Sequence, residues 1–244
     1  MNNWIIPNWP APPNIQALFT TRLGGISKGK YESFNLGNHV GDTSYAVNFN
    51  REKLFGSIPN KPKWLNQIHG STPIWVDKNT NSPKGDAALS KTANIVCGIL
   101  TADCLPVFLC DETGTVVGIA HAGWRGLISE IIEKTVAEMR KESNDIIAYL
   151  GPAIGPNYFE IGEEIRSSFI KKDKKSISAF TPSPRENKKW LANIFLLARH
   201  RLIRAGVTKI YSHEECTYSN PNKFFSYRRD GITGRMAGLI WLTR

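Results

Sequence analysis

Residues 93–121 read ANIVCGILTADCLPVFLCDETGTVVGIAH and contain three apolar runs separated by short polar breaks. Short runs rich in Val, Ile and Phe are typical of strands, and the DETG sequence at 111–114 predicts a hairpin between the second and third runs. The runs do not alternate strictly between apolar and polar residues, which indicates that both faces of the sheet are covered. We therefore expect this stretch to form the buried centre of the fold.

The segments on either side of this stretch alternate between strand and helix patterns. Apolar residues recur every three or four positions in 126–142, as in an amphipathic helix. Further helices are expected at 43–55 and 190–206, and further strands at 16–22, 145–151, 207–213 and 236–242. We expect an α/β (α+β) fold in a single domain over 1–244, with a central mixed β-sheet and helices on both faces.

The charge balance is basic, with 31 Lys and Arg against 21 Asp and Glu and a net charge of +10. A basic excess is compatible with nucleic acid, an anionic membrane or an anionic small substrate. The run KKDKK at 171–175 lies in a polar stretch that continues to about 189, and we expect a solvated loop there. Since no zinc-finger spacing or RNA-binding aromatic signature accompanies it, we expect no nucleic-acid partner.

Export and membrane insertion are both disfavoured by the sequence. The first residues, MNNWIIPNWPAPP, lack the basic start and long apolar segment of a secretory signal. The longest apolar run, 95–110, is interrupted by Asp103 and Pro106 and is too short to span a bilayer. We expect a cytoplasmic protein with no membrane partner, whose four cysteines are free thiols.

The segment GIAHAGWRG (118–126) places His121 where a strand ends and a helix begins. Ligands commonly bind at such switch points. Gly123 and Gly126 allow the backbone to approach a ligand closely, and the start of the helix together with Arg125 favours an anion. A histidine that only caps the strand through a backbone hydrogen bond is the alternative interpretation.

Two other segments carry reactive side chains at strand ends. In TADCLP (101–106), Cys104 follows a buried strand and has Asp103 beside it; in NQIHG (66–70), His69 precedes a glycine. Two imidazoles and one thiolate are the ligand set of an open catalytic zinc site, in which water takes the fourth position and becomes more acidic. The same groups without metal could instead form a cysteine nucleophile, Cys104, with a histidine base.

Several long segments together resemble one known family. They are NQIHG (66–70), TADCLPVFL (101–109), GIAHAGWRG (118–126), YLGPAIGPNYFEIGEE (149–164) and FFSYRRDGITGRMA (224–237). The sequence from about residue 15 onward is similar to the YfiH-type laccase-domain family, once described as multicopper polyphenol oxidases and now as purine nucleoside phosphorylases. One departure is Asn157-Tyr158, where the family often carries a cysteine pair.

The resemblance implies a YfiH-like α/β fold, with His69, Cys104 and His121 as zinc ligands. It also implies phosphorolysis of adenosine, inosine, guanosine and methylthioadenosine, deamination of adenosine, and in bacteria a peptidoglycan-editing role. A multicopper centre needs on the order of ten histidines, whereas this chain has five. A single copper ion in place of zinc, at the site of His69, Cys104 and His121, is the alternative that stays open.

Phosphorolysis requires groups that hold phosphate, stabilise the leaving purine and tolerate positive charge on the ribose. Arginines are suited to phosphate, and we assign catalytic roles to Arg22, Arg125 and Arg228, with Arg235 as a further candidate. Deamination needs a carboxylate that passes protons, which makes Asp103 the catalytic acid or base and Asp86 an alternative. The substrate-binding assignments are His39, Asp86, Arg229 and Asn35. The partners expected are purine nucleosides and phosphate, and the competing function is that of a cysteine hydrolase acting on a peptidoglycan precursor through Cys104.

Overall fold

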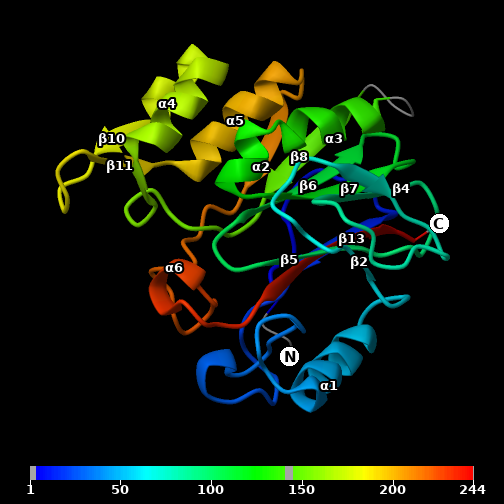
Figure 1. Ribbon diagram of the computed structural model, residues 1–244. Helices are drawn as coiled ribbons and strands as arrows, with labels where there is room; N and C mark the ends of the chain where they lie inside the picture. Colours follow the sequence, from blue (N-terminus) through cyan, green and yellow to red (C-terminus); the bar gives the residue numbers. More distant parts are fainter. Residues whose placement is uncertain (1–3, 141–144, 244) are drawn as a thin grey trace.

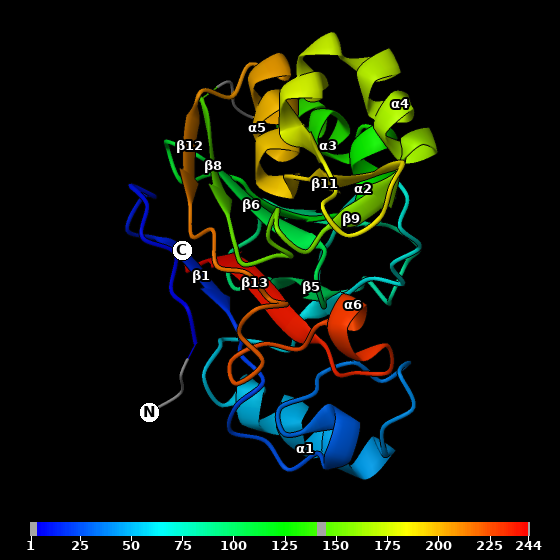
Figure 2. The same cartoon turned by 90° about the vertical axis from the view of Figure 1, so that its left-hand side faces the viewer.

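The computed structural model describes residues 4–140 and 145–243. Two β-sheets lie face to face in the middle of the molecule (Figure 2). The six-stranded sheet has the order β12-β8-β6-β7-β4-β3, with strands β3 (Pro73–Trp75), β4 (Ala87–Ser90), β6 (Leu105–Asp111), β7 (Val117–Ala122), β8 (Ile146–Leu150) and β12 (Lys209–Ser212). The four-stranded sheet has the order β1-β13-β5-β2, with strands β1 (Ile15–Phe19), β2 (Lys63–Trp64), β5 (Cys97–Thr101) and β13 (Met236–Leu242). Both sheets contain parallel and antiparallel pairs, so both are mixed.

Helices cover the outer face of each of these two sheets (Figure 1). The described helices are α1 (Ser44–Phe55), α2 (Trp124–Ile128), α3 (Ile131–Met139), α4 (Glu163–Lys172), α5 (Ile194–Arg204) and α6 (Tyr227–Asp230), with short 3-10 turns η1 (Gly29–Tyr31) and η2 (Lys174–Ala179). Of these, α6 lies beside the ends of the strands (Figure 2). Val136 of α3 packs with the six-stranded sheet, and Leu54 of α1 packs with the four-stranded sheet. The mixed α/β class with helices on both faces is therefore confirmed.

The three apolar runs of 93–121 become β5, β6 and β7, which are buried along their whole length. The second and third form the expected antiparallel hairpin. Asp111 closes it, because its carboxylate accepts hydrogen bonds from the backbone N–H of Thr115 and Val116. Phe108 and Ile119 pack with Ile99 of the other sheet. Each of these strands therefore lies between two packed layers, which explains why apolar and polar residues do not alternate along it.

The helix expected over 126–142 is two helices. The first, α2, begins at Trp124, earlier than expected. The chain then turns at Glu130, whose φ is 70°, and α3 begins at the next residue. Residue types give little sign of this left-handed turn, because an isolated glutamate has no preference for it. Residues 141 and 142 lie outside the described part of the chain.

The helix expected over 190–206 begins only at Ile194. Asn193 is its N-cap and accepts a hydrogen bond from the Leu196 N–H, as asparagine commonly does. The preceding residues belong to a small sheet with the order β10-β11-β9, formed by β9 (Glu160–Gly162), β10 (Phe180–Pro182) and β11 (Lys189–Ala192).

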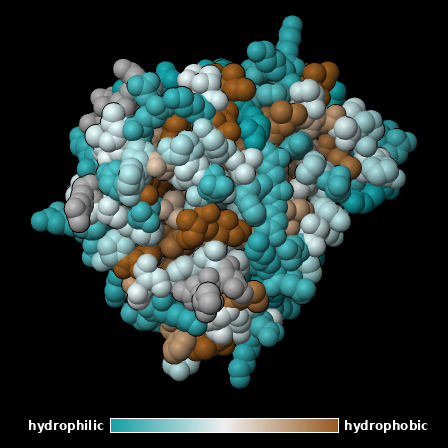
Figure 3. All heavy atoms as spheres, turned by 180° about the vertical axis from the view of Figure 1, so that it is seen from behind, coloured by the Kyte–Doolittle hydropathy of each residue, from teal (hydrophilic) through white to brown (hydrophobic). Residues whose placement is uncertain are grey.

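The polar stretch from 171 to 189 is not the loop that we expected. It contains the end of α4, then η2 and β10, because Ser176, Ala179 and Phe180 are buried beneath its exposed lysines. Elsewhere the surface mixes hydrophilic and hydrophobic side chains, with hydrophobic ones gathered near the centre of the face in Figure 3. Among the described helices, none combines the length and apolar character that a membrane crossing requires.

Candidate active site

Two strand ends and the loop between β2 and β3 bring Cys104, His121 and His69 together, so the strand end expected at His69 is a loop instead. The antiparallel register pairs Pro106 at the start of β6 with His121 near the end of β7, so Cys104, just before β6, lies beside His121. The two imidazole rings are 4.9 Å apart between centroids and lie edge to face. One ligand atom from each of the three residues falls within 4.8 Å of the others. The convergence expected from the sequence is thus present in the structure.

Asp86 holds two of these residues from behind. Its fully buried carboxylate accepts a hydrogen bond from Nδ1 of His121 at 3.0 Å, and it accepts others from the backbone N–H groups of Ile68, His69 and Gly70 at 2.7 to 3.2 Å. This fixes the tautomer of His121 and leaves Nε2 for the cluster. Asp86 was expected to bind substrate; it is absent from the cavity lining, and its carboxylate is engaged with His121 and the 68–70 loop.

Gly123 leaves the space that the cluster needs. A Cβ at this position would lie 2.9 Å from Sγ of Cys104 and 3.7 Å from Cδ2 of His69. A methyl group would therefore push directly on the sulfur.

The electrostatics of the cluster favour a thiolate. Burial alone would raise the pKa of Cys104, but the neighbouring His121 and His69 lower it to about 6. Burial alone would lower the pKa of His121, but Cys104 and Asp86 raise it to about 9. The thiolate is the form of cysteine that binds metals and acts as a nucleophile.

The three residues fit a single soft or borderline divalent ion. Two ligand atoms on one zinc ion are roughly 3.5 Å apart, so atoms within 4.8 Å of one another need only small side-chain adjustments. Histidine nitrogen and cysteine sulfur are both zinc ligands, and a buried carboxylate behind a ligating histidine is usual at such sites. Within the described residues, this is the one such cluster of three or more potential ligands, and it offers too few imidazoles for a multicopper centre.

A cavity of about 780 Å³ opens in front of the cluster. Its lining includes three arginines and three histidines but no Asp or Glu: Arg51, Arg125, Arg235, His39, His69 and His121. Gln67 also lines it and is held by two hydrogen bonds to the backbone of Leu100. A cavity of this composition is suited to an anionic ligand.

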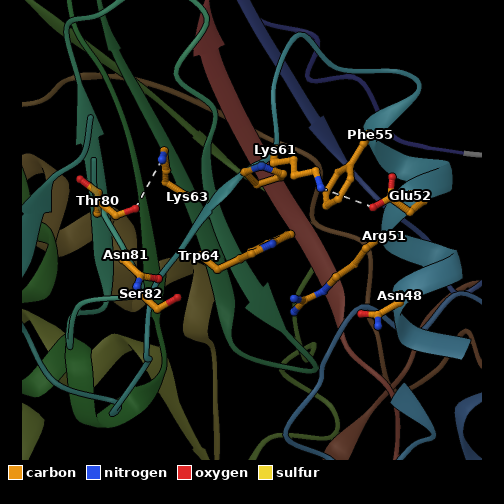
Figure 4. Close-up of a pocket in the computed structure, with 11 residues that line it drawn as sticks. Asn48, Arg51, Glu52, Phe55, Lys61, Lys63, Trp64, Thr80, Asn81 and Ser82 are labelled. Carbon is orange, nitrogen blue, oxygen red and sulfur yellow. Dashed lines mark hydrogen bonds and ion pairs between the residues drawn. The ribbon is translucent and has the colours of Figure 1, made fainter. Parts of the chain in front are cut away.

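A smaller cavity of about 350 Å³ lies next to it and shares Arg51, Trp64 and Ser82 with it (Figure 4). The guanidinium of Arg51 lies 5.2 Å from the Trp64 ring centroid. These two side chains therefore form a common wall, with Lys61 and Lys63 on the side of the smaller cavity.

Of the predicted catalytic and substrate-binding residues, Arg125 and His39 line the cavity, as does the further candidate Arg235. The first two are more exposed than Arg235. Arg125 lies over the ring of Trp124 at 4.3 Å. The pKa of His39 is lowered mainly by its burial, and to a smaller extent by the positive charges of Arg235 and then Arg51.

Asp103 does not line the cavity. Its carboxylate accepts hydrogen bonds from Oγ1 of Thr217 at 2.6 Å, Oγ of Ser226 at 3.0 Å and the backbone N–H of Arg228 at 2.6 Å. Both oxygens are therefore occupied by chain segments distant in sequence. This placement is that of a link between loops and adds no support to the catalytic role expected for Asp103.

Arg228 and Arg229 likewise lie outside the cavity lining. Arg228 donates to the carbonyl of Glu160, and Arg229 donates to three backbone carbonyls and pairs with Asp230. Arg229 fastens the C-terminal loops through these bonds, and Arg228 ties its loop to Glu160 through Nη1 alone.

Arg22 and Asn35 were also expected in the site, and each has a structural position instead. Arg22 lies over the Phe225 ring and donates to the carbonyls of Glu32 and Pro221. Asn35 is fully buried, and its Oδ1 accepts hydrogen bonds from the backbone N–H groups of Gly37 and Arg235.

Sequence reasoning missed Arg51, Trp64 and Gln67. Gln67 belongs to the NQIHG segment, so its neighbour His69 was a usable signal. Arg51 is one polar residue among several on α1, and nothing local distinguishes it from a solvent-exposed arginine.

Comparisons with known proteins show the family to which the chain belongs. Residues 16–243 match the family described as multi-copper polyphenol oxidoreductase laccase. The chain belongs to this family. It is 46% identical to a protein of Escherichia coli named purine nucleoside phosphorylase YfiH, over 99% of this chain and 100% of that one. A purine nucleoside phosphorylase of Pseudomonas aeruginosa is 43% identical over 99% of each chain.

Solved structures of family members have the same fold. A crystal structure of a Neisseria meningitidis protein superposes with a TM-score of 0.94 at 43% identity, covering 99% of this chain and 100% of that one. YlmD of Geobacillus stearothermophilus gives a TM-score of 0.91 at 30% identity, covering 99% and 96%.

Proposed function

We propose that the protein is a metal-dependent purine nucleoside phosphorylase whose metal is held by His69, Cys104 and His121. The observation that carries the proposal is the position of this cluster in a 780 Å³ cavity with cationic but no acidic side chains. The names of the relatives from Escherichia coli and Pseudomonas aeruginosa support the same reaction class.

The reaction joins a phosphate oxygen to C1′ of the ribose and breaks the bond from C1′ to N9 of the purine. The electrons of that bond go to the base, which takes up a proton and leaves. In this chain, the cavity arginines bind the phosphate, and Asp86 keeps His121 oriented. A bound zinc ion would supply Lewis acidity and a more acidic water at the site.

The finer assignments follow the family. We propose zinc as the metal, and adenosine, inosine, guanosine and methylthioadenosine as substrates. Deamination of adenosine to inosine is a second proposed activity. Asp103 and Asp86 are both engaged by hydrogen bonds, so neither is assigned as the proton carrier in that reaction.

The test is release of hypoxanthine from inosine as a function of phosphate, with metal content measured on the same sample. We expect about one zinc per chain, phosphate-dependent release, and loss of both in His121→Ala. Protein with a full metal complement that leaves inosine intact at every phosphate concentration contradicts the proposal.

A cysteine hydrolase acting on a peptidoglycan precursor is the second candidate. One observation favours it: the pKa of Cys104 is lowered to about 6, against the effect of its burial, by His121 and His69. This enzyme would lose activity on alkylation of Cys104 and keep it in the presence of a chelator. The metal-dependent phosphorylase would lose activity with the chelator, and its bound zinc would protect Cys104 from alkylation.

A further inference from the structure

Two arginines from opposite parts of the chain meet at one residue of the 33–42 loop. Nε and Nη2 of Arg51, on α1, donate to the carbonyl of Leu36 at 3.0 and 2.8 Å. The backbone N–H of Leu36 donates to the carbonyl of Arg235, which precedes β13. Gly37 lets Arg235 pass closely, since a Cβ there would lie 2.8 Å from its Cγ.

Both guanidinium groups are held in the same way. Arg51 lies against the ring of Trp64, and Arg235 lies 5.9 Å from the ring centroid of Tyr227. Arg235 also donates through Nη1 to the carbonyls of Thr233 and Gly234. Each side chain is thus fixed by backbone carbonyls and an aromatic ring, a preorganised arrangement for binding.

Neither arginine forms a direct ion pair within the described residues, although the charges of Cys104 and Asp103 partly offset the effect of burial on the pKa of Arg235. In the described part of the chain, neither Nη1 of Arg51 nor Nε and Nη2 of Arg235 donate a hydrogen bond. Burial lowers the pKa of both side chains from the ordinary arginine value. A partly buried cation that makes no direct ion pair is costly, and a bound anion would offset that cost.

The other arginines of the site region are less suited to this task. Arg22, Arg228 and Arg229 donate to backbone carbonyls outside the cavity lining, and Arg125 is exposed on the cavity rim beside Trp124. Arg51 and Arg235 are the two half-buried arginines that line the cavity.

We propose that Arg51 and Arg235 form the clamp that binds the phosphate co-substrate, with their free N–H groups directed to its oxygens. The assignment rests on the proposed phosphorylase function, because it names the residues that hold the anion in that reaction. Planar guanidinium groups are suited to two-point contacts with a phosphate. The clamp would place the anion in the same cavity as the cluster of His69, Cys104 and His121.

The test uses metal-loaded full-length protein with Arg51→Gln, Arg51→Lys and Arg235→Gln substitutions. Lys61→Gln is the matched control, because Lys61 lies on the far side of the Arg51–Trp64 wall and pairs with Glu52. Binding of inorganic phosphate is measured by calorimetry, and KM is measured separately for phosphate and inosine. Thermal melting shows which variants are folded.

We expect the glutamine variants to bind phosphate at least about tenfold more weakly, since a charged hydrogen bond contributes this much. In the same variants, KM for phosphate should rise by the same factor and KM for inosine should change little. Arg51→Lys should keep part of the phosphate affinity that Arg51→Gln loses. Lys61→Gln should bind phosphate like the unaltered protein. If Arg235→Gln does not fold, the two variants Arg51→Gln and Arg51→Lys decide the outcome.

The clamp and the enzyme function can fail separately. If the protein releases hypoxanthine but KM for phosphate is unchanged in the folded glutamine variants, the clamp is wrong and the function stands. If phosphate binding is lost in those variants but inosine is never cleaved, the clamp stands as an anion site and the phosphorylase function is wrong. A loss of phosphate binding in Lys61→Gln as large as in Arg51→Gln also overturns the clamp.

Discussion

Asp86 and His121 are joined twice: the carboxylate of Asp86 accepts a hydrogen bond from Nδ1 of His121, and its carbonyl accepts one from the His121 N–H at 2.7 Å. The same carboxylate also gathers the N–H groups of the 68–70 loop, on which His69 lies. One buried acid therefore positions two of the three proposed ligands.

Replacing Asp86 should weaken metal binding more than it weakens the fold. We expect Asp86→Asn to lower zinc affinity by about 10- to 100-fold, the usual effect of removing a carboxylate behind a histidine ligand. Competition with a chromophoric chelator measures this. Asp111→Asn is the control, because Asp111 is equally buried but closes the distant β6–β7 hairpin. Equal zinc affinity in the Asp86 and Asp111 variants would show that Asp86 does not orient the ligands.

Adding a methyl group at Gly123 should displace the sulfur of Cys104. The backbone there, with φ −74° and ψ 169°, suits alanine, so Gly123→Ala should fold. The new Cβ would lie 2.9 Å from Sγ, and we expect zinc affinity to fall by about tenfold or more. Gly56→Ala serves as the comparison, since its Cβ meets only the Lys53 carbonyl at an ordinary 3.6 Å. Unchanged zinc binding in Gly123→Ala is the contrary result.

The cysteines should differ widely in reactivity. Its histidine neighbours lower the pKa of Cys104 against the effect of burial, whereas burial raises the pKa of Cys97 and Cys110. Mass spectrometry after brief iodoacetamide treatment should find Cys104 modified and those two intact. Zinc should protect Cys104 but not the partly exposed Cys216. Equal modification of Cys104 with and without zinc would argue against a metal bound through its sulfur.

A buried ion pair joins α3 to α5. Nη1 of Arg201, whose side chain is 1% exposed, lies 3.3 Å from Oε1 of Glu133. We expect Glu133→Gln to lower the free energy of unfolding by about 3 kcal/mol, because it leaves a buried cation unpaired. The double change Glu133→Leu with Arg201→Met should cost no more than about 1 kcal/mol. Urea unfolding measures both, and a double variant less stable than the single one contradicts this account.

The strand ends of the site could be predicted from the sequence because their signals are local. Apolar runs mark β5, β6 and β7, and the polar residues that follow them become His121 and Cys104 of the cluster. Residues 190–192 fit a helix as well as a strand, and pairing of β11 with β9 and β10 decides between them. That pairing is a long-range contact, which residue types alone do not reveal.

The arginines show the same limit at the level of single side chains. Arg51 and Arg228 both donate to a distant backbone carbonyl, yet of the two Arg51 alone lines the cavity. What separates them is where the folded chain places each side chain relative to the cavity. Asp103 was assigned to catalysis because it adjoins Cys104, whereas its partners lie more than a hundred residues further along the chain.

X-ray absorption at the zinc edge of the loaded protein tests the central claim most directly. We expect one sulfur at about 2.3 Å and two imidazole nitrogens at about 2.0–2.1 Å around a single ion. The sulfur contribution should vanish in Cys104→Ser, and one imidazole contribution should be lost in His69→Ala. A spectrum without sulfur, or one that is unchanged by Cys104→Ser, would show that these three residues do not hold the metal.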